Sequence, residues 1–316
     1  MENTQGLKSL AGNSRSKQSS IKAMAAQNGA GCVSASVLKR AAKAGFGLCF
    51  LFLAAAAFGE KPARNPLPTR TPNLEIMRSA HRGVSAYAPE NTLPAIRKAI
   101  ELGYAYVEID VRYTRDGAPV LMHDGSLLRT TNGWGKVSSK SLSEIKKLDA
   151  GFWRVGFRGT EVPTLEQALE LMQGRIKLYL DLKQGVRPEL IVLLKRYGFY
   201  PDNLVVCCAI DELLKYEPEA PVMPFLGDAG PVEELLRQYP SAVAFDSKCG
   251  QLTAEMVREA HRHGVMVFTD ALGLSSEKCM RRPIEFGADV IQFDNLRLYS
   301  KVLARMKSES RAPAEN

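Results

Sequence analysis

The chain has 316 residues, of which 45% are hydrophobic and 24% are charged, and its formal net charge is +8. This composition is that of a globular protein and excludes a disordered or collagen-like chain. Residues 1–60 hold seven Lys or Arg against two Glu, a net +5, which leaves only +3 for the other 256 residues. Those residues contain no stretch rich in Lys and Arg with interleaved aromatic residues, so we expect no nucleic-acid partner.

The first 60 residues are predicted to be a leader separate from the globular domain. Residues 1–35 are polar and small and show no apolar period, which predicts disorder. Three positive residues then precede the uncharged run Ala44–Gly59, which is shorter than the roughly 20 residues that cross a bilayer as a helix. This order indicates a secretory signal peptide cleaved near Glu60, and therefore a periplasmic or secreted protein. The alternatives are an uncleaved membrane anchor over residues 44–59 and a buried core helix.

Four of the six cysteines lie beyond the leader. Cys207 and Cys208 are adjacent in an apolar run, where the alternation of a strand sends their side chains to opposite faces. Cys249 and Cys279 stand alone. None of the four has the spacing of a metal site, and we expect buried or unreactive thiols.

From residue 74 to residue 307 the chain repeats one unit: a short apolar run, a polar turn and an amphipathic helical stretch. This alternation predicts an α/β domain with a parallel sheet and helical crossovers. Eight units over about 235 residues match a closed (β/α)8 barrel of the TIM type better than an open doubly wound sheet, and no GxGxxG follows a run. The eight runs are Leu74–Ala80, Ala105–Val111, Ile176–Leu182, Leu204–Ala209, Val222–Leu226, Ala242–Phe245, Val265–Thr269 and Val290–Phe293. The predicted helices include Thr92–Leu102, Thr164–Met172, Pro188–Tyr197, Pro231–Tyr239, Thr253–His263, Ser276–Phe286 and Leu296–Met306.

One segment departs from this pattern. Residues Gly125–Pro163 follow a hairpin-like stretch, Ala118–His123, and form a small insertion after the second strand. In a barrel this insertion would lie above the mouth at the carboxyl ends of the strands, where the catalytic residues of such barrels are found.

Two strands carry carboxylates at the predicted mouth. Glu108 and Asp110 are two residues apart, so both side chains project to the same side of their strand. Asp181 and Lys183 repeat this spacing on the next parallel strand. Three carboxylates on one interior face repel one another, and a hard divalent cation such as Ca²⁺ or Mg²⁺ would relieve the repulsion. The alternative is an internal ion-pair network that includes Arg112 and Lys183.

The chain has only four histidines. His81 and His123 directly follow strand-like runs, whereas His261 and His263 lie at the end of a helix, where a solvated positive charge is favourable. Two imidazoles beside three carboxylates and two cations indicate phosphoryl chemistry, in which one His accepts a proton and the other donates one. The absence of GxSxG argues against a serine nucleophile.

The motifs around these residues resemble the glycerophosphodiester phosphodiesterase family, over about Met77 to Lys301. They are His81-Arg82-Gly83, Ala88-Pro89-Glu90-Asn91-Thr92, Glu108-x-Asp110-Val111-Arg112, Thr114-Arg115-Asp116-Gly117, His123-Asp124, Arg129-Thr130-Thr131-Asn132-Gly133, Leu148-Asp149-Ala150-Gly151, Val162-Pro163-Thr164-Leu165-Glu166, Gly287-Ala288-Asp289 and Asp294-Asn295.

The resemblance implies a metal-dependent barrel enzyme of lipid and glycerol metabolism. Such an enzyme hydrolyses deacylated phospholipids such as glycerophosphocholine to an alcohol and sn-glycerol 3-phosphate, with one divalent cation, Ca²⁺ or Mg²⁺. The implied acid/base pair is His81 and His123, and the implied metal ligands are Glu108, Asp110 and Asp181. The implied phosphate-binding residues are Arg82 and Lys183. Glu90 and Asn91 are the implied supporting residues, and Glu90 is expected to orient the site near His81.

The substrate is less closely defined than the reaction. Asp181 stands where this family usually has Glu, which is one methylene longer. The alternatives are a lysophospholipase D or phosphoinositide phospholipase C-like enzyme and a non-catalytic binding barrel. A wide apolar rim would favour a lipid substrate, but Gly125–Gly135 and Gly227–Pro231 read as short and mostly polar. Phe152 and the two tryptophans of the insertion are expected to pack it onto the barrel; alternatively, one covers the glycerol or a choline-like cation.

Overall fold

The computed structural model describes residues 76–227, 231–273 and 276–310. The predicted leader and its signal peptide or anchor lie outside the described residues. Among the described helices, none combines the length and apolar character that a membrane crossing requires.

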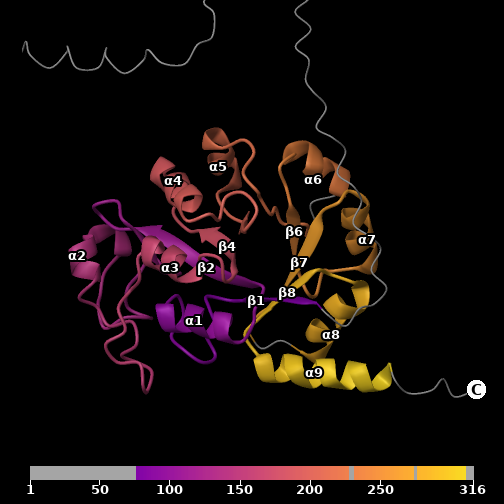
Figure 1. Cartoon of the computed structure of the whole chain (residues 1–316), viewed down its shortest axis with the longest axis horizontal. Coiled ribbons are helices and arrows are strands. Elements are labelled where there is room, and N and C mark those ends of the chain that lie inside the picture. Colours follow the sequence, from indigo (N-terminus) through magenta and orange to yellow (C-terminus); the bar gives the residue numbers. More distant parts are fainter. Residues whose placement is uncertain (1–75, 228–230, 274–275, 311–316) are drawn as a thin grey trace, which may run out of the picture. The chain divides into compact units, whose positions relative to one another are not determined.

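Seven parallel strands form one continuous sheet in the order β5-β4-β2-β1-β8-β7-β6, and the helices surround them (Figure 1). The strands are β1 (Met77–Ala80), β2 (Tyr106–Tyr113), β4 (Lys177–Leu182), β5 (Leu204–Val206), β6 (Ala244–Lys248), β7 (Met266–Ala271) and β8 (Val290–Phe293). The remaining predicted run, residues 222–226, bridges both edges of this sheet: Val222 pairs with Val206 and with Ala242, and Phe225 pairs with Asp246. The sheet is therefore a nearly closed barrel, and the predicted fold class is confirmed.

The helices follow the strands as predicted. Five of them begin after a Thr or Ser whose side chain accepts a hydrogen bond from the first turn, the preferred start of a helix. The helix after β5 was not among the helices predicted from the sequence. The helices are α1 (Leu93–Glu101), α2 (Leu142–Ile145), α3 (Leu165–Met172), α4 (Pro188–Arg196), α5 (Ile210–Tyr216), α6 (Val232–Gln238), α7 (Ala254–Arg262), α8 (Glu277–Phe286) and α9 (Leu296–Glu309), with a 3-10 turn, η1, at Val137–Ser139.

The barrel interior consists of an apolar layer beneath a polar one. The apolar layer comprises Tyr106, Tyr179, Val205, Met223, Ala244, Phe268 and Val290. The Phe268 ring meets the Tyr106 and Tyr179 rings edge to face, with centroids 5.0 and 5.9 Å apart. Two residues further along their strands, the same face carries Glu108, Asp181, Asp246, Asp270 and Gln292. The apolar layer thus closes the floor beneath a polar mouth.

The predicted insertion has a small core of its own. The strand β3 (Pro119–Leu121), just before the insertion, pairs antiparallel with β2, as the hairpin-like pattern predicted. Buried side chains such as Leu127, Val137 and Ile145 fill this core. Trp134 is 75% exposed and Trp153 46% exposed, and Phe152 is also exposed. The prediction that these rings pack the insertion onto the barrel is therefore wrong, because smaller aliphatic residues already fill the space.

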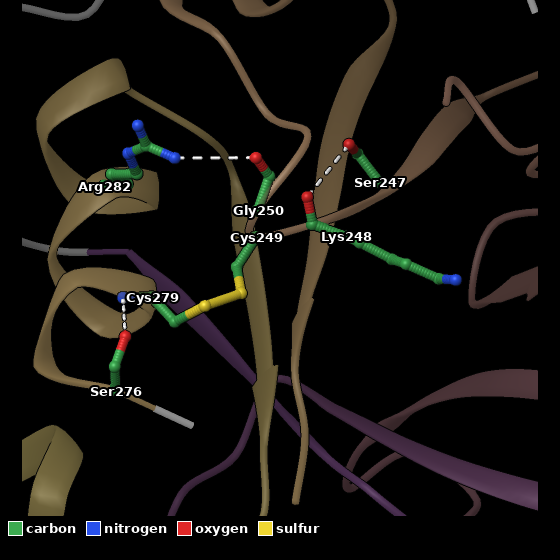
Figure 2. The surroundings of a disulfide bond; sticks show 7 residues. All are labelled: Ser247, Lys248, Cys249, Gly250, Ser276, Cys279 and Arg282. Carbon is green, nitrogen blue, oxygen red and sulfur yellow. Dashed lines mark hydrogen bonds between the residues drawn. A yellow bond between two sulfur atoms is a disulfide. The ribbon is translucent and has the colours of Figure 1, made fainter. Parts of the chain in front are cut away.

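The cysteines differ from the sequence-based expectation. Cys249, after β6, forms a disulfide with Cys279 in α8, 30 residues further along the chain (Figure 2). Strand β5 ends at Val206, so strand alternation does not apply to Cys207 and Cys208, and their Sγ atoms lie 3.2 Å apart. The expectation that Cys249 and Cys279 are separate thiols was wrong, and so was the expectation that the Cys207 and Cys208 side chains point to opposite faces.

Candidate active site

The segment after β1 is a tight turn that only glycine permits. Gly83 has φ +75°, and a Cβ there would lie 2.6 Å from the Ala95 Cβ of α1. This close approach brings the Arg82 amide to Glu108, whose Oε2 accepts its hydrogen bond at 2.6 Å. Arg82 itself has φ 54°. The His-Arg-Gly motif thus places two of its side chains at the carboxyl end of β1.

Asp294 holds His81. The carboxylate follows β8, the neighbour of β1, and its Oδ1 lies 2.7 Å from the His81 Nδ1. Burial acts to raise the pKa of Asp294, but the bond and charge of His81, the Gly273 amide and the Arg82 charge together outweigh it and lower the pKa. Because Nδ1 is engaged, Nε2 is the nitrogen that His81 offers to a ligand. The sequence motif contained Asp294, but its role was not anticipated.

His123 is held by its own neighbour in the chain. The Asp124 Oδ1 lies 2.6 Å from the His123 Nδ1, and the Arg129 Nε donates to the Asp124 Oδ2 at 2.6 Å. The hydrogen bond from Arg129 lowers the pKa of Asp124 strongly. Arg112 donates from Nε to the His123 carbonyl at 2.8 Å. His123 therefore also exposes Nε2, from a position at the edge of the insertion.

Glu90 joins these two groups of residues. It accepts from Arg82 at 3.0 Å and from Arg129 at 2.7 Å. Burial acts to raise the pKa of Glu90, but the bonds and charges of Arg129 and Arg82 outweigh it and lower the pKa. Glu90 was expected to orient the site near His81; its partners are the two arginines instead, and Asp294 holds His81.

The three predicted metal-ligating carboxylates converge. Oxygen atoms of Glu108, Asp110 and Asp181 all lie within 4.8 Å of one another, and Asp110 is opposite Asp181 in the β2–β4 register. Burial and the neighbouring Asp110 raise the pKa of Glu108 well above its usual value. The buried Asp181 Oδ1 has no hydrogen-bond partner among the described residues. Such a set of oxygen atoms fits a hard divalent cation.

Lys183 and Asn91 support this cluster. The Lys183 Nζ lies 2.5 Å from the Asp181 Oδ2 and 3.2 Å from the Asp110 Oδ1. Burial opposes the charge on Lys183, but the two carboxylates outweigh burial and raise its pKa. The Asn91 amide donates to Asp110 at 2.6 Å and accepts from the Asp110 backbone at 3.0 Å. Eight of the nine predicted site residues therefore lie in one network of hydrogen bonds and ion pairs, and His81 adjoins it as the chain neighbour of Arg82.

The other two histidines lie elsewhere. His261 is buried, and its Nε2 lies 2.8 Å from the Asp289 Oδ2. The expectation of a solvated helix end was wrong for His261, because it shares the buried face of α7 with Val257 and Ala260. His263 is partly exposed and contacts Glu259 at 3.2 Å.

Sequence reasoning missed two further acids of the mouth, Asp246 and Asp270. Burial raises the pKa of Asp246 to about 7, and the pKa of Asp270 is raised as well by burial and by Asp246. Asp270 accepts from the Gln292 amide at 3.2 Å. Strand alternation from Ala244 and Phe268 was the signal that could have placed both acids inside.

Residues 81–196 match the model of the glycerophosphoryl diester phosphodiesterase family. This stretch belongs to that family. It contains all nine predicted site residues, and the resemblance read from the sequence is confirmed.

Relatives and solved structures of the family extend the match. The chain is 35% identical over 175 residues to glycerophosphodiester phosphodiesterase 1 of Bos taurus, covering 53% of each protein. It is 43% identical over 134 residues to a glycerophosphodiester phosphodiesterase of Caldanaerobacter subterraneus, covering 40% of this chain and 55% of the relative. The chain thus spans about half the length of these curated relatives.

The crystal structure of a glycerophosphodiester phosphodiesterase from Agrobacterium tumefaciens superposes with a TM-score of 0.66 at 28% identity, over 72% of this chain and all of that one. A phosphodiesterase of Oleispira antarctica, solved with the product sn-glycerol-3-phosphate, superposes with a TM-score of 0.61 at 25% identity, over 72% of this chain and 96% of that one.

Proposed function

We propose that this protein hydrolyses glycerophosphodiesters to an alcohol and sn-glycerol 3-phosphate. The observation that carries the proposal is a pair of histidines, each held at Nδ1 by a carboxylate, beside a cluster of three carboxylates. The names of the relatives and the product complex of the Oleispira antarctica protein support it.

In this proposal Glu108, Asp110 and Asp181 hold one divalent cation, Ca²⁺ or Mg²⁺. The cation would neutralise charge on the phosphate oxygens and hold them in place. Arg82 and Lys183 add positive charge for the phosphate. Glu90 and Asn91 keep Arg82 and Asp110 in position, which limits the rearrangement needed when substrate binds.

The histidines then move the protons. One Nε2 accepts the proton of the glycerol 2-hydroxyl, whose oxygen attacks phosphorus to form a cyclic phosphate, while the other imidazolium protonates the departing alcohol. Water then opens the ring with the two roles reversed. Because Asp294 and Asp124 bond Nδ1, each ring exchanges its proton through Nε2.

The test is release of choline from glycerophosphocholine. The protein is dialysed against EDTA, and Ca²⁺ or Mg²⁺ is added back separately. We expect activity only with an added divalent cation, and Glu108→Gln to require more of it. Full turnover in excess EDTA would contradict the metal assignment, and no turnover with any cation would favour the non-catalytic binding barrel.

A lipid substrate is the second candidate, and the exposed apolar side chains of the insertion favour it. Leu128 is 71% exposed, and its neighbour Arg129 bonds both Glu90 and Asp124. Exposed Trp134, Trp153 and Val155 lie on the same insertion. Contiguous exposed apolar surface marks sites of protein–protein or membrane interaction, and a lipid substrate would use such a surface beside the site. The sequence-based description of the Gly125–Gly135 loop as mostly polar therefore overlooked its two exposed apolar residues.

A comparison of two substrates separates these candidates. Leu128→Ser with Trp134→Ser is expected to lower the rate on lysophosphatidylcholine vesicles several-fold and to leave the rate on glycerophosphocholine unchanged. Val192→Ser is the matched control, because Val192 is 55% exposed on α4, outside the insertion. Equal effects on both substrates would contradict a lipid-binding role of the insertion.

We also propose that the protein acts outside the cytoplasm, after cleavage near Glu60. The Cys249–Cys279 disulfide supports this, because disulfides persist mainly in oxidising compartments. Mass spectrometry of the native protein tests it: an intact N-terminus on a cytosolic form would contradict export, and an intact one in the membrane fraction would favour the anchor at residues 44–59.

A further inference from the structure

Two free thiols lie at the carboxyl end of β5, beside the carboxylate cluster. Cys207 and Cys208 are the free cysteines of the described part of the chain. Their Sγ atoms are 3.2 Å apart. The two Sγ atoms and one carboxylate oxygen of Asp181 all lie within 4.8 Å of one another. Two thiols and one carboxylate are therefore already assembled as three ligands.

The backbone holds this arrangement in place. The Cys207 amide donates to the Leu180 carbonyl of β4 at 3.2 Å, which ties the first thiol to the strand that carries Asp181. Cys207 also packs against the apolar floor of the barrel. Ala209 then adopts φ 54°, a left-handed turn that ends the extended chain and starts α5. Both thiols therefore remain at the mouth.

Sulfur ligands select a different class of metal from the adjacent cluster. Thiolates favour soft and borderline cations such as Cd²⁺ and Zn²⁺, whereas carboxylates alone favour Ca²⁺ and Mg²⁺. The Asp181 Oδ1 is buried and has no hydrogen-bond partner among the described residues, so it is available to complete a set of three. We propose that Cys207, Cys208 and Asp181 form a separate binding site for a thiophilic divalent cation, with solvent as the fourth ligand.

The shared carboxylate couples this site to the proposed catalytic one. Asp181 belongs to both ligand sets, and its other oxygen is held by Lys183. A cation bound by the two thiols would draw Asp181 away from Glu108 and Asp110 and place a second positive charge next to the first. Resting on the proposed function, the consequence is that thiophilic cations inhibit the enzyme in competition with Ca²⁺ or Mg²⁺.

The binding test uses the full chain with Cys32→Ser and Cys49→Ser, so that Cys207 and Cys208 are the only free thiols and the Cys249–Cys279 disulfide stays intact. Cd²⁺ is titrated into the EDTA-dialysed protein, and its ultraviolet charge-transfer band with thiolate is recorded. We expect one equivalent to saturate the band. Mutating a residue that only hydrogen-bonds to a metal ligand typically weakens metal binding roughly 10–100-fold. Cys207→Ser and Cys208→Ser each remove a ligand itself, so each should weaken Cd²⁺ binding by about 100-fold or more.

Glu108→Gln is the discriminating control. It should weaken Ca²⁺ or Mg²⁺ binding and leave the Cd²⁺ titration unchanged, whereas Asp181→Asn should weaken both. An unchanged Cd²⁺ titration in Cys207→Ser with Cys208→Ser would overturn the proposal, and so would an equal effect of Glu108→Gln on both classes of cation. The charge-transfer band does not depend on turnover, so this outcome stays distinct from a failure of the proposed hydrolysis.

The activity test follows from the coupling. With glycerophosphocholine and Mg²⁺, Cd²⁺ should inhibit the Cys32→Ser, Cys49→Ser protein, and extra Mg²⁺ should relieve the inhibition. The concentration of Cd²⁺ needed for half inhibition should rise by about the same factor in the Cys207→Ser variant as its binding weakens. Equal inhibition of the Cys32→Ser, Cys49→Ser protein and of its Cys207→Ser variant would overturn the proposal that Cd²⁺ at the thiol site competes with Mg²⁺.

Discussion

The two halves of the barrel mouth handle negative charge differently. In the first half, Glu90, Asp110 and Asp181 each lie within 3.2 Å of an Arg or Lys nitrogen. In the second half, neither Asp246 nor Asp270 has a Lys or Arg at ion-pair distance in the part of the chain that the structure describes, and the pKa values of both are raised. The first half therefore pairs most of its carboxylates with cations, although burial raises the pKa of Glu108, whereas the second half holds two buried acids with raised pKa values and no paired cation.

This difference indicates where the chemistry lies. A phosphodiester needs positive charge to bind it, and Arg82 and Lys183 carry that charge in the paired half, where both proposed proton-transferring histidines also lie. The second half contributes Asp294 to His81 and part of the apolar floor beneath the cluster, including Phe268.

The largest effect is expected from the two histidines of the first half. His81→Ala and His123→Ala should each lower kcat by roughly 10² to 10⁴, because a positioned acid or base typically contributes that much. The thermal unfolding midpoint and the affinity for phosphate should change little, since Arg82, Lys183 and the carboxylates proposed to hold the cation remain. Steady-state kinetics over a range of pH measures this, and the unmodified protein should give a bell-shaped profile.

The other two histidines provide the controls, and the structure separates them. His263→Ala should leave kcat and stability nearly unchanged, because the ring is partly exposed. His261→Ala removes one partner of a buried pair with Asp289 and should destabilise the fold by about 3 kcal/mol without a specific loss of kcat in the folded fraction. If the His81 and His123 variants kept near-normal turnover, the acid/base assignment would fail.

A smaller effect is expected at Asp294, which links the halves. Asp294→Asn keeps the shape but removes the negative charge beside His81, and kcat should fall by roughly 10–100-fold, less than in His81→Ala. One limb of the pH–rate profile should move toward acid, because the imidazolium loses its counter-charge. Asp124→Asn is the matched variant for His123. A lower kcat with an unchanged profile would mean that Asp294 only stabilises the loop.

The smallest effect concerns Asp246 and stability. The folded-state pKa of about 7 exceeds the usual 3.8, so the folded protein binds more protons than the unfolded one between these values. Stability from this group is therefore full below about pH 4 and is lost as the pH rises through 7. Asp246→Asn should raise the free energy of unfolding by about 2 kcal/mol at pH 9, and by little at pH 4. Urea unfolding of the EDTA-treated protein at the two pH values measures this difference, and a gain of equal size at both would contradict it.

Local patterns predicted most of the fold. All eight apolar runs lie in the barrel wall, because each strand and its following helix bury one face in the same repeating way. The spacing of Glu108, Asp110 and Asp181 likewise placed three carboxylates together, since side chains two apart on a strand share a face. These inferences needed only the spacing of hydrophobic residues in each strand and helix and the parallel arrangement of the strands.

Contacts between distant segments could not be predicted in this way. Asp294 meets His81 across 213 residues of sequence, and Cys249 meets Cys279 only because the β6–α7 loop lies against α8. His261 was misjudged because a helix end was assumed to be solvated, whereas its amphipathic face turns inward. The exposure of Trp134 could not be predicted either, because it depends on which aliphatic residues fill the core of the insertion.

The insertion is attached to the barrel in a way that affects how the protein can diversify. Its hydrophobic core is separate from that of the barrel, and Arg154 reaches the carbonyls of Ser85 and Ala88 in the loop after β1. Backbone carbonyls are present whatever the local side chains are, so this anchorage does not require a matching partner sequence. A different excursion could replace residues 125–163 only if it kept Arg129, which bonds Glu90 and Asp124, whereas the exposed remainder can vary and alter what reaches the mouth.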